Sequence, residues 1–310
     1  MEKIPLIVVP GATASGKTAL GIQLAQLFGG EVVSADSMQI YKQMNIGTAK
    51  PTAEEMQGIV HHLMDFVEPD QAFSVAEYTE LAHQTIATIH RRGKVPVMVG
   101  GTGLYINSVV NDVSFGETDA NQDRRHELEL LAQEQGGQAL LRLLEPVDPA
   151  SAKVLHPNNQ RRIIRAIEFY EQTGIPISEH QKQTQQVQSR YEPVMVAISW
   201  ERDVLYQRIG QRVDLMLEAG LLEEVRQLMD KGYTKHMNAM KGIGYKEVMD
   251  YFRGLMTYKE MVHILKRDSR RYAKRQLTWF RRDQRIHWIP AGNQIAEKAA
   301  EYIKKQWDKK

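Results

Sequence analysis

Residues 6–18 read LIVVPGATASGKT, and this stretch decides the fold. Its first four residues form an apolar run without helical period, which is the pattern of a buried strand. Residues 11–18 then match the pattern G-x-x-x-x-G-K-[ST], and a helical pattern follows from Lys17 to Phe28. A strand, a glycine-bounded loop and a helix in this order predict a P-loop, in which backbone N–H groups and the start of a helix surround a phosphate group.

The residue types in this loop suit phosphate binding. Lys17 can neutralise phosphate oxygens, and Thr18 can act as a ligand of Mg²⁺. The pattern leaves the reaction open, because the same loop can hold a triphosphate that loses its terminal phosphoryl group or a diphosphate that leaves a carbon atom. The predicted phosphate-binding residues are Gly11, Ala12, Thr13, Ala14, Ser15, Gly16, Lys17 and Thr18.

Strand and helix patterns alternate after the P-loop. Apolar runs at 31–34 and 95–99 predict two more strands, and Ser74 and Glu77 between them have the spacing of a helix capping box. Such alternation predicts a doubly wound α/β fold, with a parallel sheet covered by helices on both faces. Ligands of this fold bind where the strands end.

Strand patterns stop after the third strand and resume at residues 193–198. The stretch in between is rich in Glu, Gln, Arg and Leu, and its residues 159–173 form an amphipathic helical pattern that ends before Gly174. We therefore predict an all-helical insertion domain at residues 115–191. Residues 1–114 and 192–310 would form the P-loop core, with basic helices in its carboxyl-terminal part.

Composition narrows the class of protein. The 310 residues are 42% hydrophobic and 25% charged, as in a globular protein. No stretch of the sequence approaches the roughly 18 consecutive apolar residues that a membrane span needs, so no membrane partner is expected. The absence of cysteine excludes disulfides, thiolate metal sites and cysteine nucleophiles. The first residues lack the pattern of a secretion signal, so we expect a cytoplasmic protein, and we expect a monomer. The histidines show no metal-ligand spacing, so any metal is expected to arrive with the phosphates.

Two polar residues follow the second and third predicted strands. Asp36 can accept a proton from a bound acceptor, or it can cap the turn that follows; its place at the ligand edge favours catalysis. Thr102 lies in the run GGTGLY at residues 100–105, where its hydroxyl can donate to a phosphate or cap a helix.

Basic residues gather in three places. Residues 266–285 contain nine Lys or Arg and two Asp, mixed with aromatic residues, which favours an RNA partner over a solvated helix face. Arg161 and Arg165 share one face of a helix and suit phosphates or bases, although a solvated face explains them equally well. Arg208 and Arg212 also share a face and could clamp a diphosphate or pair with nearby Glu residues.

Six motifs in a fixed order make the chain similar to a known family. They are GATASGKT, SADSMQIY, GGTGLY, HPNNQRRIIRAIE, GIGYKE and AKRQLTWFRR, and they span almost the whole chain from Pro5 to Trp288. In these motifs the chain closely resembles the bacterial tRNA dimethylallyltransferases. It departs from the family at position 12, where Ala stands in place of the usual Pro.

The resemblance implies transfer of a dimethylallyl group from dimethylallyl diphosphate to N6 of the adenine on the 3′ side of the tRNA anticodon. It implies Mg²⁺ held through Thr18, the anticodon stem-loop of tRNA as partner, and an insertion domain that acts as a lid on the tRNA. The implied catalytic residues are Asp36, as base, with Thr102 and Arg212. The implied tRNA-binding residues are Asp36, Ser37, Met38, Gln39, Gln160, Arg161, Arg162, Ile163, Ile164, Lys274, Arg275, Trp279 and Arg281.

Three other readings share part of this pattern. A kinase of small metabolites would need the P-loop and an acceptor carboxylate, but not the basic aromatic segment. A prenyltransferase of free adenine nucleotides would need no surface for a polyanion. A nucleotide-switched RNA-binding protein would leave Asp36 and Thr102 without a role.

Overall fold

The computed structural model describes residues 3–113, 115, 122–185 and 189–308. The chain forms two compact units. One is the core unit, residues 1–110 with 190–310, and the other is the helical unit, residues 111–189. The predicted insertion begins four residues later, at 115, and residue 114 lies outside the described part of the chain.

The core unit is built on a six-stranded sheet in the order β3-β2-β4-β1-β5-β6. Every pair of neighbouring strands is parallel. This arrangement confirms the predicted α/β fold with a parallel sheet. The strands are β1 (Ile4–Pro10), β2 (Gly30–Ser34), β3 (His61–His62), β4 (Val95–Gly100), β5 (Tyr191–Ser199) and β6 (Ile286–Pro290).

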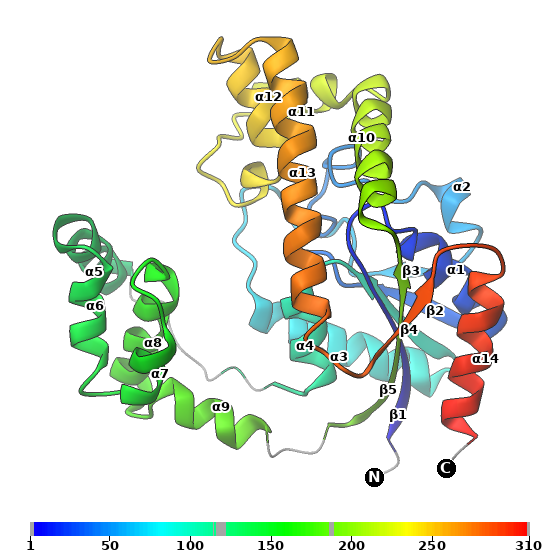
Figure 1. Ribbon diagram of the computed structural model, residues 1–310, viewed down its shortest axis with the longest axis horizontal. Coiled ribbons are helices and arrows are strands. Elements are labelled where there is room, and N and C mark those ends of the chain that lie inside the picture. Colours follow the sequence, from blue (N-terminus) through cyan, green and yellow to red (C-terminus); the bar gives the residue numbers. More distant parts are fainter. Residues whose placement is uncertain (1–2, 114, 116–121, 186–188, 309–310) are drawn as a thin grey trace. The chain divides into compact units, whose positions relative to one another are not determined.

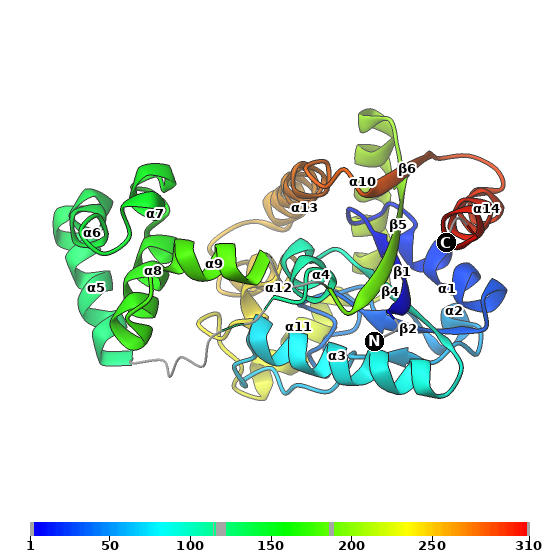
Figure 2. The same cartoon turned by 90° about the horizontal axis from the view of Figure 1, so that it is seen from below.

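Helices cover both faces of this sheet, because its central strands are apolar on both sides. Leu6 and Val8 of β1 pack with α3 (Val75–Arg91) and α4 (Gly103–Val110), whereas Ile7 and Val9 pack with α1 (Lys17–Leu27) and α14 (Ile295–Trp307). Figure 2 shows α1 and α14 together beside the strands. The predicted capping box at the start of α3 is present, with Ser74 and Glu77 bonded reciprocally.

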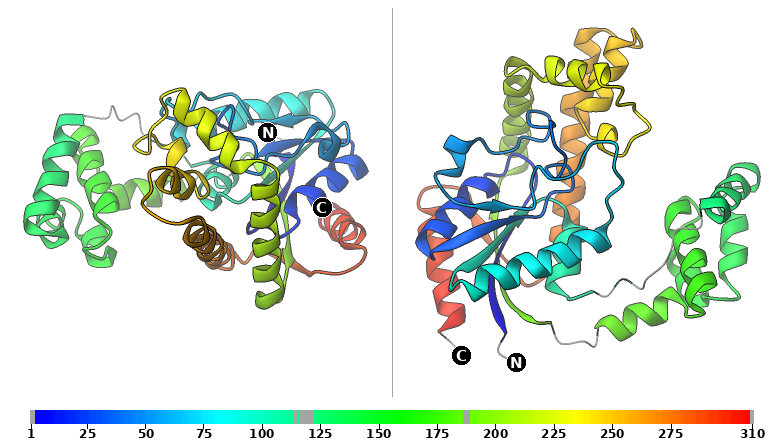
Figure 3. Two further views of the ribbon diagram at one scale, coloured as in Figure 1. Left: turned by 90° about the horizontal axis from the view of Figure 1, so that it is seen from above. Right: turned by 180° about the vertical axis from the view of Figure 1, so that it is seen from behind.

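A third group of helices lies beyond the carboxyl ends of the strands (Figure 1 and Figure 3). Its longest member, α13, runs back alongside the sheet and leads into β6. None of the helices in the described ranges is long and apolar enough to cross a bilayer. The group consists of α10 (Arg202–Glu218), α11 (Leu221–Asp230), α12 (Tyr245–Phe252) and α13 (Tyr258–Phe280), and the short α2 (Ala53–Met56) and 3₁₀ helix η1 (Ala239–Lys241) complete the core unit.

Residues 202–230 form two helices, α10 and α11, rather than one continuous helix. Gly220, with a φ of 98°, ends one helix and begins the next, and a left-handed residue cannot continue an α-helix. The break turns α11 back so that Leu221 and Val225 pack into the cluster that contains Tyr245.

The helical unit has its own core. Leu140, Ile163 and Ile167 are buried there, so the amphipathic pattern predicted for residues 159–173 packs within this unit. The unit consists of α5 (Gln122–Gln135), α6 (Gly137–Leu144), α7 (Pro149–Val154), α8 (Gln160–Thr173) and α9 (Ile177–Gln185).

A buried carboxylate lies at the start of β2. Glu31 is 2% exposed, and its oxygens accept from His62 at 2.7 Å, from Arg92 at 2.5 Å and from Lys94 at 2.8 Å. Burial alone acts to raise the pKa of Glu31, but the bonds from Lys94 and His62 and the charge of Arg92 outweigh it and lower the pKa to about 2. The ionised carboxylate therefore stabilises the folded state at neutral pH.

We expect Glu31→Gln to lower the free energy of unfolding near neutral pH by about 1–3 kcal/mol, because the amide cannot pair with these cations. The folded-state pKa lies below the ordinary 4.5, so the stabilisation is complete above that value and is lost as the pH falls towards 2. Urea unfolding at a series of pH values should show the difference from the original protein shrinking over that window. Glu134→Gln, at an exposed position on α5, is the matched control and should leave the free energy of unfolding nearly unchanged. If the loss of unfolding free energy in Glu31→Gln did not depend on pH, the prediction would be contradicted.

Candidate active site

The predicted phosphate loop joins β1 to α1. Ala14 and Gly16 have positive φ values of 61° and 88°, and no side chain caps the first turn of α1. The N–H groups at the start of that helix are therefore open to an anion. At least three N–H groups of the loop are used within the described part of the protein. Gly11 donates to the Gly100 carbonyl at 3.2 Å, Ser15 donates to the Ala12 carbonyl at 3.3 Å, and Thr13 donates to Gln276.

Side chains from later in the chain form hydrogen bonds to backbone carbonyls of the phosphate loop. The indole of Trp200 donates to the Ser15 carbonyl at 2.9 Å, and Arg208 donates to the Ala14 carbonyl at 3.0 Å. The Arg208 guanidinium also lies 4.3 Å from the Trp200 ring centre. Of the two readings left open for Arg208, the structure favours neither a clamp on a diphosphate nor a pair with Glu; the side chain supports the loop.

Three charged groups of the site influence one another. The pKa of Lys17 is lowered to about 8 by burial and by the charge of Arg212, while Asp36 opposes the change. Burial also lowers the pKa of Arg212, and Asp36 again opposes it. The Arg212 Nε is buried without a hydrogen-bond partner among the described residues, as is the Ser15 hydroxyl. Two cations and unpartnered donors beside one carboxylate make a site that favours an anion.

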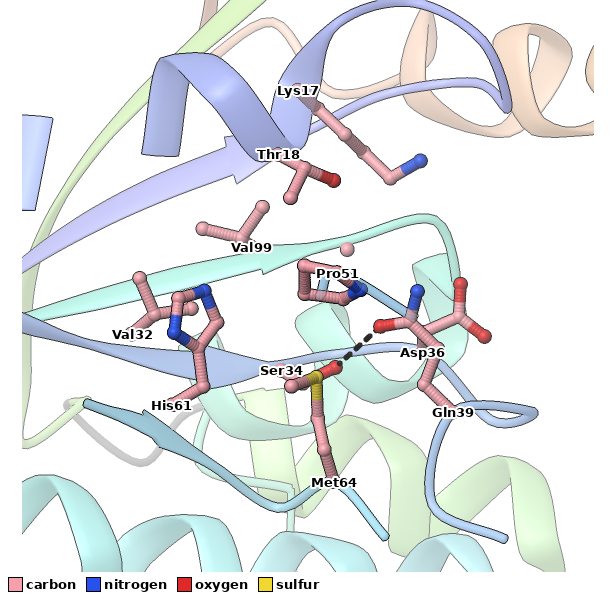
Figure 4. Close-up of a pocket in the computed structure, with 11 residues that line it drawn as sticks. Lys17, Thr18, Val32, Ser34, Asp36, Gln39, Pro51, His61, Met64 and Val99 are labelled. Carbon is pink, nitrogen blue, oxygen red and sulfur yellow. Dashed lines mark hydrogen bonds between the residues drawn. The ribbon is translucent and has the colours of Figure 1, made fainter. Parts of the chain in front are cut away.

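A pocket opens between the P-loop and the end of β2. Figure 4 shows Lys17 and Thr18 extending from the start of α1, with the Asp36 carboxylate at the other side of the opening. Its remaining lining combines apolar and polar groups. The lining residues are Lys17, Thr18, Val32, Ser34, Asp36, Gln39, Pro51, His61, Met64, Val99 and Gly100.

Asp36 and Thr102 meet in the turn after β2. Asp36 Oδ1 accepts from the Met38 N–H at 2.9 Å, so this oxygen caps the turn while the residue also lines the pocket. The Thr102 hydroxyl accepts from the Ser37 N–H at 2.9 Å and donates to the Ser37 hydroxyl at 3.2 Å. Thr102 thus holds the turn that carries Asp36, and its catalytic role stays a prediction.

The segment after Asp36 is fixed by Gln39 and by Glu224, of which the sequence did not single out Glu224. Gln39 donates to two backbone carbonyls of the same loop, at Thr48 and Ala49. The carboxylate of Glu224 accepts three N–H groups of residues 45–47 at 2.7–3.0 Å and the Tyr245 hydroxyl at 2.7 Å. The side chain of Gln39 is therefore bonded within the loop, and its tRNA contact stays a prediction.

Gln276 on α13 is another residue that sequence reasoning missed. Its Oε1 accepts from the Thr13 N–H and its Nε2 donates to the Gly101 carbonyl, both at 2.9 Å. Helical periodicity carried a signal for it, because Tyr272, Gln276 and Trp279 share one face of α13. That face packs against the loops at the strand ends, and Trp279 lies against Gly103.

The opposite face of α13 carries the predicted tRNA-binding cations. Lys274, Arg275 and Arg281 are exposed, and in the described part of the chain none of the three forms an ion pair with a carboxylate. Trp279 differs from them because it is partly buried against the core. It therefore offers less surface for stacking on a base than the sequence predicts.

The helical unit carries the remaining predicted tRNA contacts. Gln160, Arg161 and Arg162 are exposed in the first turn of α8. Ile163 and Ile164 are 0% and 3% exposed and form part of the core of the unit. The prediction that these two side chains contact tRNA is corrected, because their contacts are with other apolar side chains.

The fold and the site define a class of protein, a P-loop enzyme with a carboxylate at the end of β2, the next strand along the chain. Comparison with known proteins narrows the class, because the family model described as IPP transferase matches residues 39–283. The chain belongs to the IPP transferase family.

Individual relatives agree with this assignment. A tRNA dimethylallyltransferase of Desulforudis audaxviator is 52% identical over 285 residues, which cover 92% of this chain and 91% of the relative. The crystal structure of the tRNA isopentenylpyrophosphate transferase of Bacillus halodurans is 44% identical, with a TM-score of 0.73 over 99% of this chain and 97% of its own. A eukaryotic dimethylallyltransferase described as acting on tRNA is 30% identical, with a TM-score of 0.83 over 99% of this chain and 80% of its own.

We expect the affinity for pyrophosphate to fall about tenfold between about pH 7 and pH 9, because Lys17 loses its proton around its lowered pKa of about 8. Titration calorimetry across this range measures the effect. Lys17→Gln is the control that reports the titration of pyrophosphate itself, and its affinity should not share the fall. An equal pH dependence in both proteins would show that Lys17 does not carry the effect.

Proposed function

We propose that this protein transfers the dimethylallyl group of dimethylallyl diphosphate to N6 of the adenine on the 3′ side of a tRNA anticodon and releases diphosphate. The product is N6-dimethylallyladenosine in tRNA. The observation that carries the proposal is the position of Asp36: it lines the same pocket as Lys17 and Thr18 of the phosphate loop. An acceptor base and a holder of a leaving group are thereby combined in one site.

The proposed reaction is a displacement at the first carbon of the dimethylallyl group. The N6 lone pair forms the new N–C bond, the C–O bond to the diphosphate breaks, and the N6 proton passes to Asp36. An exocyclic amine is a weak nucleophile, so removal of its proton assists the attack. Lys17, Arg212 and the open N–H groups at the start of α1 stabilise the negative charge that develops on the departing oxygen.

We propose that Mg²⁺ enters with the diphosphate and that the Thr18 hydroxyl is its ligand from the protein. Thr18 lines the pocket beside Lys17, and a hydroxyl oxygen is a hard donor of the kind that Mg²⁺ prefers. Within the described ranges, no group of three or more His, Cys, Asp or Glu side chains is placed to hold a metal without such a substrate. When bound, the cation would offset part of the charge of the diphosphate.

We propose that the tRNA binds through the exposed cations of α13 and of α8. Lys274, Arg275 and Arg281 suit phosphates of the anticodon stem-loop, as do Arg161 and Arg162 in the helical unit. The target adenine must leave its stack to reach Asp36, because a stacked base is closed to the site. Two of the relatives named above are tRNA dimethylallyltransferases by description, which supports a tRNA substrate.

We expect Asp36→Asn to lower kcat about 10²- to 10⁴-fold, because the amide cannot accept the N6 proton. The purified protein is incubated with Mg²⁺, dimethylallyl diphosphate and unmodified tRNA, and the digested tRNA is analysed by mass spectrometry for prenylated adenosine. Asp70→Asn, at an exposed position before α3, is the control and should keep full activity. Hydrolysis of ATP or transfer of its phosphate in place of prenylation would identify a kinase and refute the proposal.

We expect Arg161→Gln and Arg275→Gln each to weaken tRNA binding and to reduce the slope of log affinity against log salt concentration by about 1, because each removes one phosphate contact. Fluorescence anisotropy with labelled tRNA over a series of salt concentrations measures the slope. Lys304→Gln, at an exposed position on α14, is the matched loss of charge and should leave the slope unchanged. Equal slopes for all four proteins would place the tRNA on another surface.

A further inference from the structure

Gln276 is a buried amide that neither phosphate binding nor RNA binding explains. Its side chain is 6% exposed, although it lies one residue from the exposed Arg275. Both ends of the amide are used on backbone groups far away in the sequence, the Thr13 N–H and the Gly101 carbonyl. A buried amide with both ends bonded costs little to bury and fixes the groups that it joins.

The two backbone groups belong to the two halves of the proposed reaction. Thr13 lies in the loop that holds the diphosphate. Gly101 precedes Thr102, whose N–H donates to the Ala35 carbonyl at 3.0 Å and whose hydroxyl accepts from Ser37 at 2.9 Å. Gln276 therefore links the phosphate loop, through the loop after β4, to the turn that carries Asp36.

On the basis of the proposed function, we infer that Gln276 is a positioning residue that sets the separation between the leaving diphosphate and Asp36. A displacement requires the attacking nitrogen, the carbon and the leaving oxygen to lie nearly in line. A shift of about 1 Å between the two halves of such a site costs about 10²-fold in rate. Gln276 touches neither reacting group and acts through the two loops.

The direction of the amide is fixed by its partners. Turned around, it would set its NH₂ group against the Thr13 N–H and its oxygen against the Gly101 oxygen. Glutamate in its place would keep the acceptor for Thr13 but set a second oxygen against the Gly101 carbonyl, which is 2.9 Å from the present nitrogen. Methionine would have a similar length and would lose both bonds.

Gly101 allows the same link to be broken from the other side. A Cβ at this position would stand 2.3 Å from Gln276 Nε2, so an alanine there must displace the amide. The backbone of Gly101 is outside the region of positive φ, so alanine meets no backbone strain. Gly101→Ala therefore tests the link while Gln276 itself is retained.

The experiment compares Gln276→Met, Gln276→Glu and Gly101→Ala with the original protein in the prenylation assay. We expect kcat at saturating donor and tRNA to fall about 10²-fold in Gln276→Met and in Gly101→Ala, and at least as far in Gln276→Glu, which sets an oxygen against the Gly101 carbonyl. The variant that combines Gln276→Met with Gly101→Ala should be no slower than the slower of these two single variants, because both substitutions break the same link. tRNA affinity and Tm should stay close to the original values.

The control and the opposing outcomes separate this inference from the proposed function. Gln227→Met makes the same chemical change at an exposed position on α11, where the Gln227 side chain donates to Glu223 at 3.1 Å, and should keep full activity. Unchanged kcat in Gln276→Met would overturn the inference. A loss of kcat that comes with an equal loss of tRNA affinity and a large fall in Tm would also overturn it, because that is the pattern of a structural residue. No prenylation by the original protein would instead refute the proposed function.

Discussion

The site depends on the parallel pairing of β1 with β4 and of β4 with β2. This pairing sets Pro10 beside Gly100 and Ser34 beside Val99, so the three loops that follow the strands leave the sheet at one edge. Strand ends expose backbone groups that no further strand can satisfy. Here the loops satisfy one another, as Gly11 donates to the Gly100 carbonyl and Ala35 donates to the Val99 carbonyl. The phosphate loop and Asp36 are near each other for this reason.

The charges at this edge are arranged for a ligand rather than for the stability of the free protein. Lys17 and Arg212 are both withdrawn from water and repel each other, and Asp36 is the carboxylate that opposes the change in both pKa values. Buried cations without full pairing are unfavourable, so this part of the fold is stabilised elsewhere, by the apolar clusters behind the loop. Ala12, Ala14 and Ala273 pack with Leu205 and Ile209 there. A bound diphosphate would offset the repulsion between Lys17 and Arg212.

The fold and the phosphate loop could be predicted because their signals are local. The loop pattern, the strand runs and the capping box of α3 each depend on residues less than ten positions apart. Gln276 bonds Thr13 across 263 positions and Glu224 bonds Asn45 across 179, so no spacing in the sequence indicates either. At residues 160–164 the sequence-based prediction is too uniform, because it assigns all five residues of one motif to tRNA binding. A helix turns consecutive residues to different faces, so Arg161 and Arg162 are exposed while Ile163 and Ile164 are buried.

The same helical periodicity explains how α13 can contact the loops at the strand ends with one face and carry the proposed RNA contacts on another. Composition alone cannot separate these two faces. Residues three or four apart share a face of a helix, so Tyr272, Gln276 and Trp279 lie over the loops at the strand ends while Lys274 and Arg275 face solvent. The aromatic residues of this segment were read from the sequence as part of an RNA surface. The structure places Trp279 against the core, while Lys274 and Arg275 are exposed on the outer face. A helix that is rigid enough to hold the phosphate loop on one side then carries the proposed RNA contacts on the other, so the two surfaces share one backbone and are fixed at a constant separation.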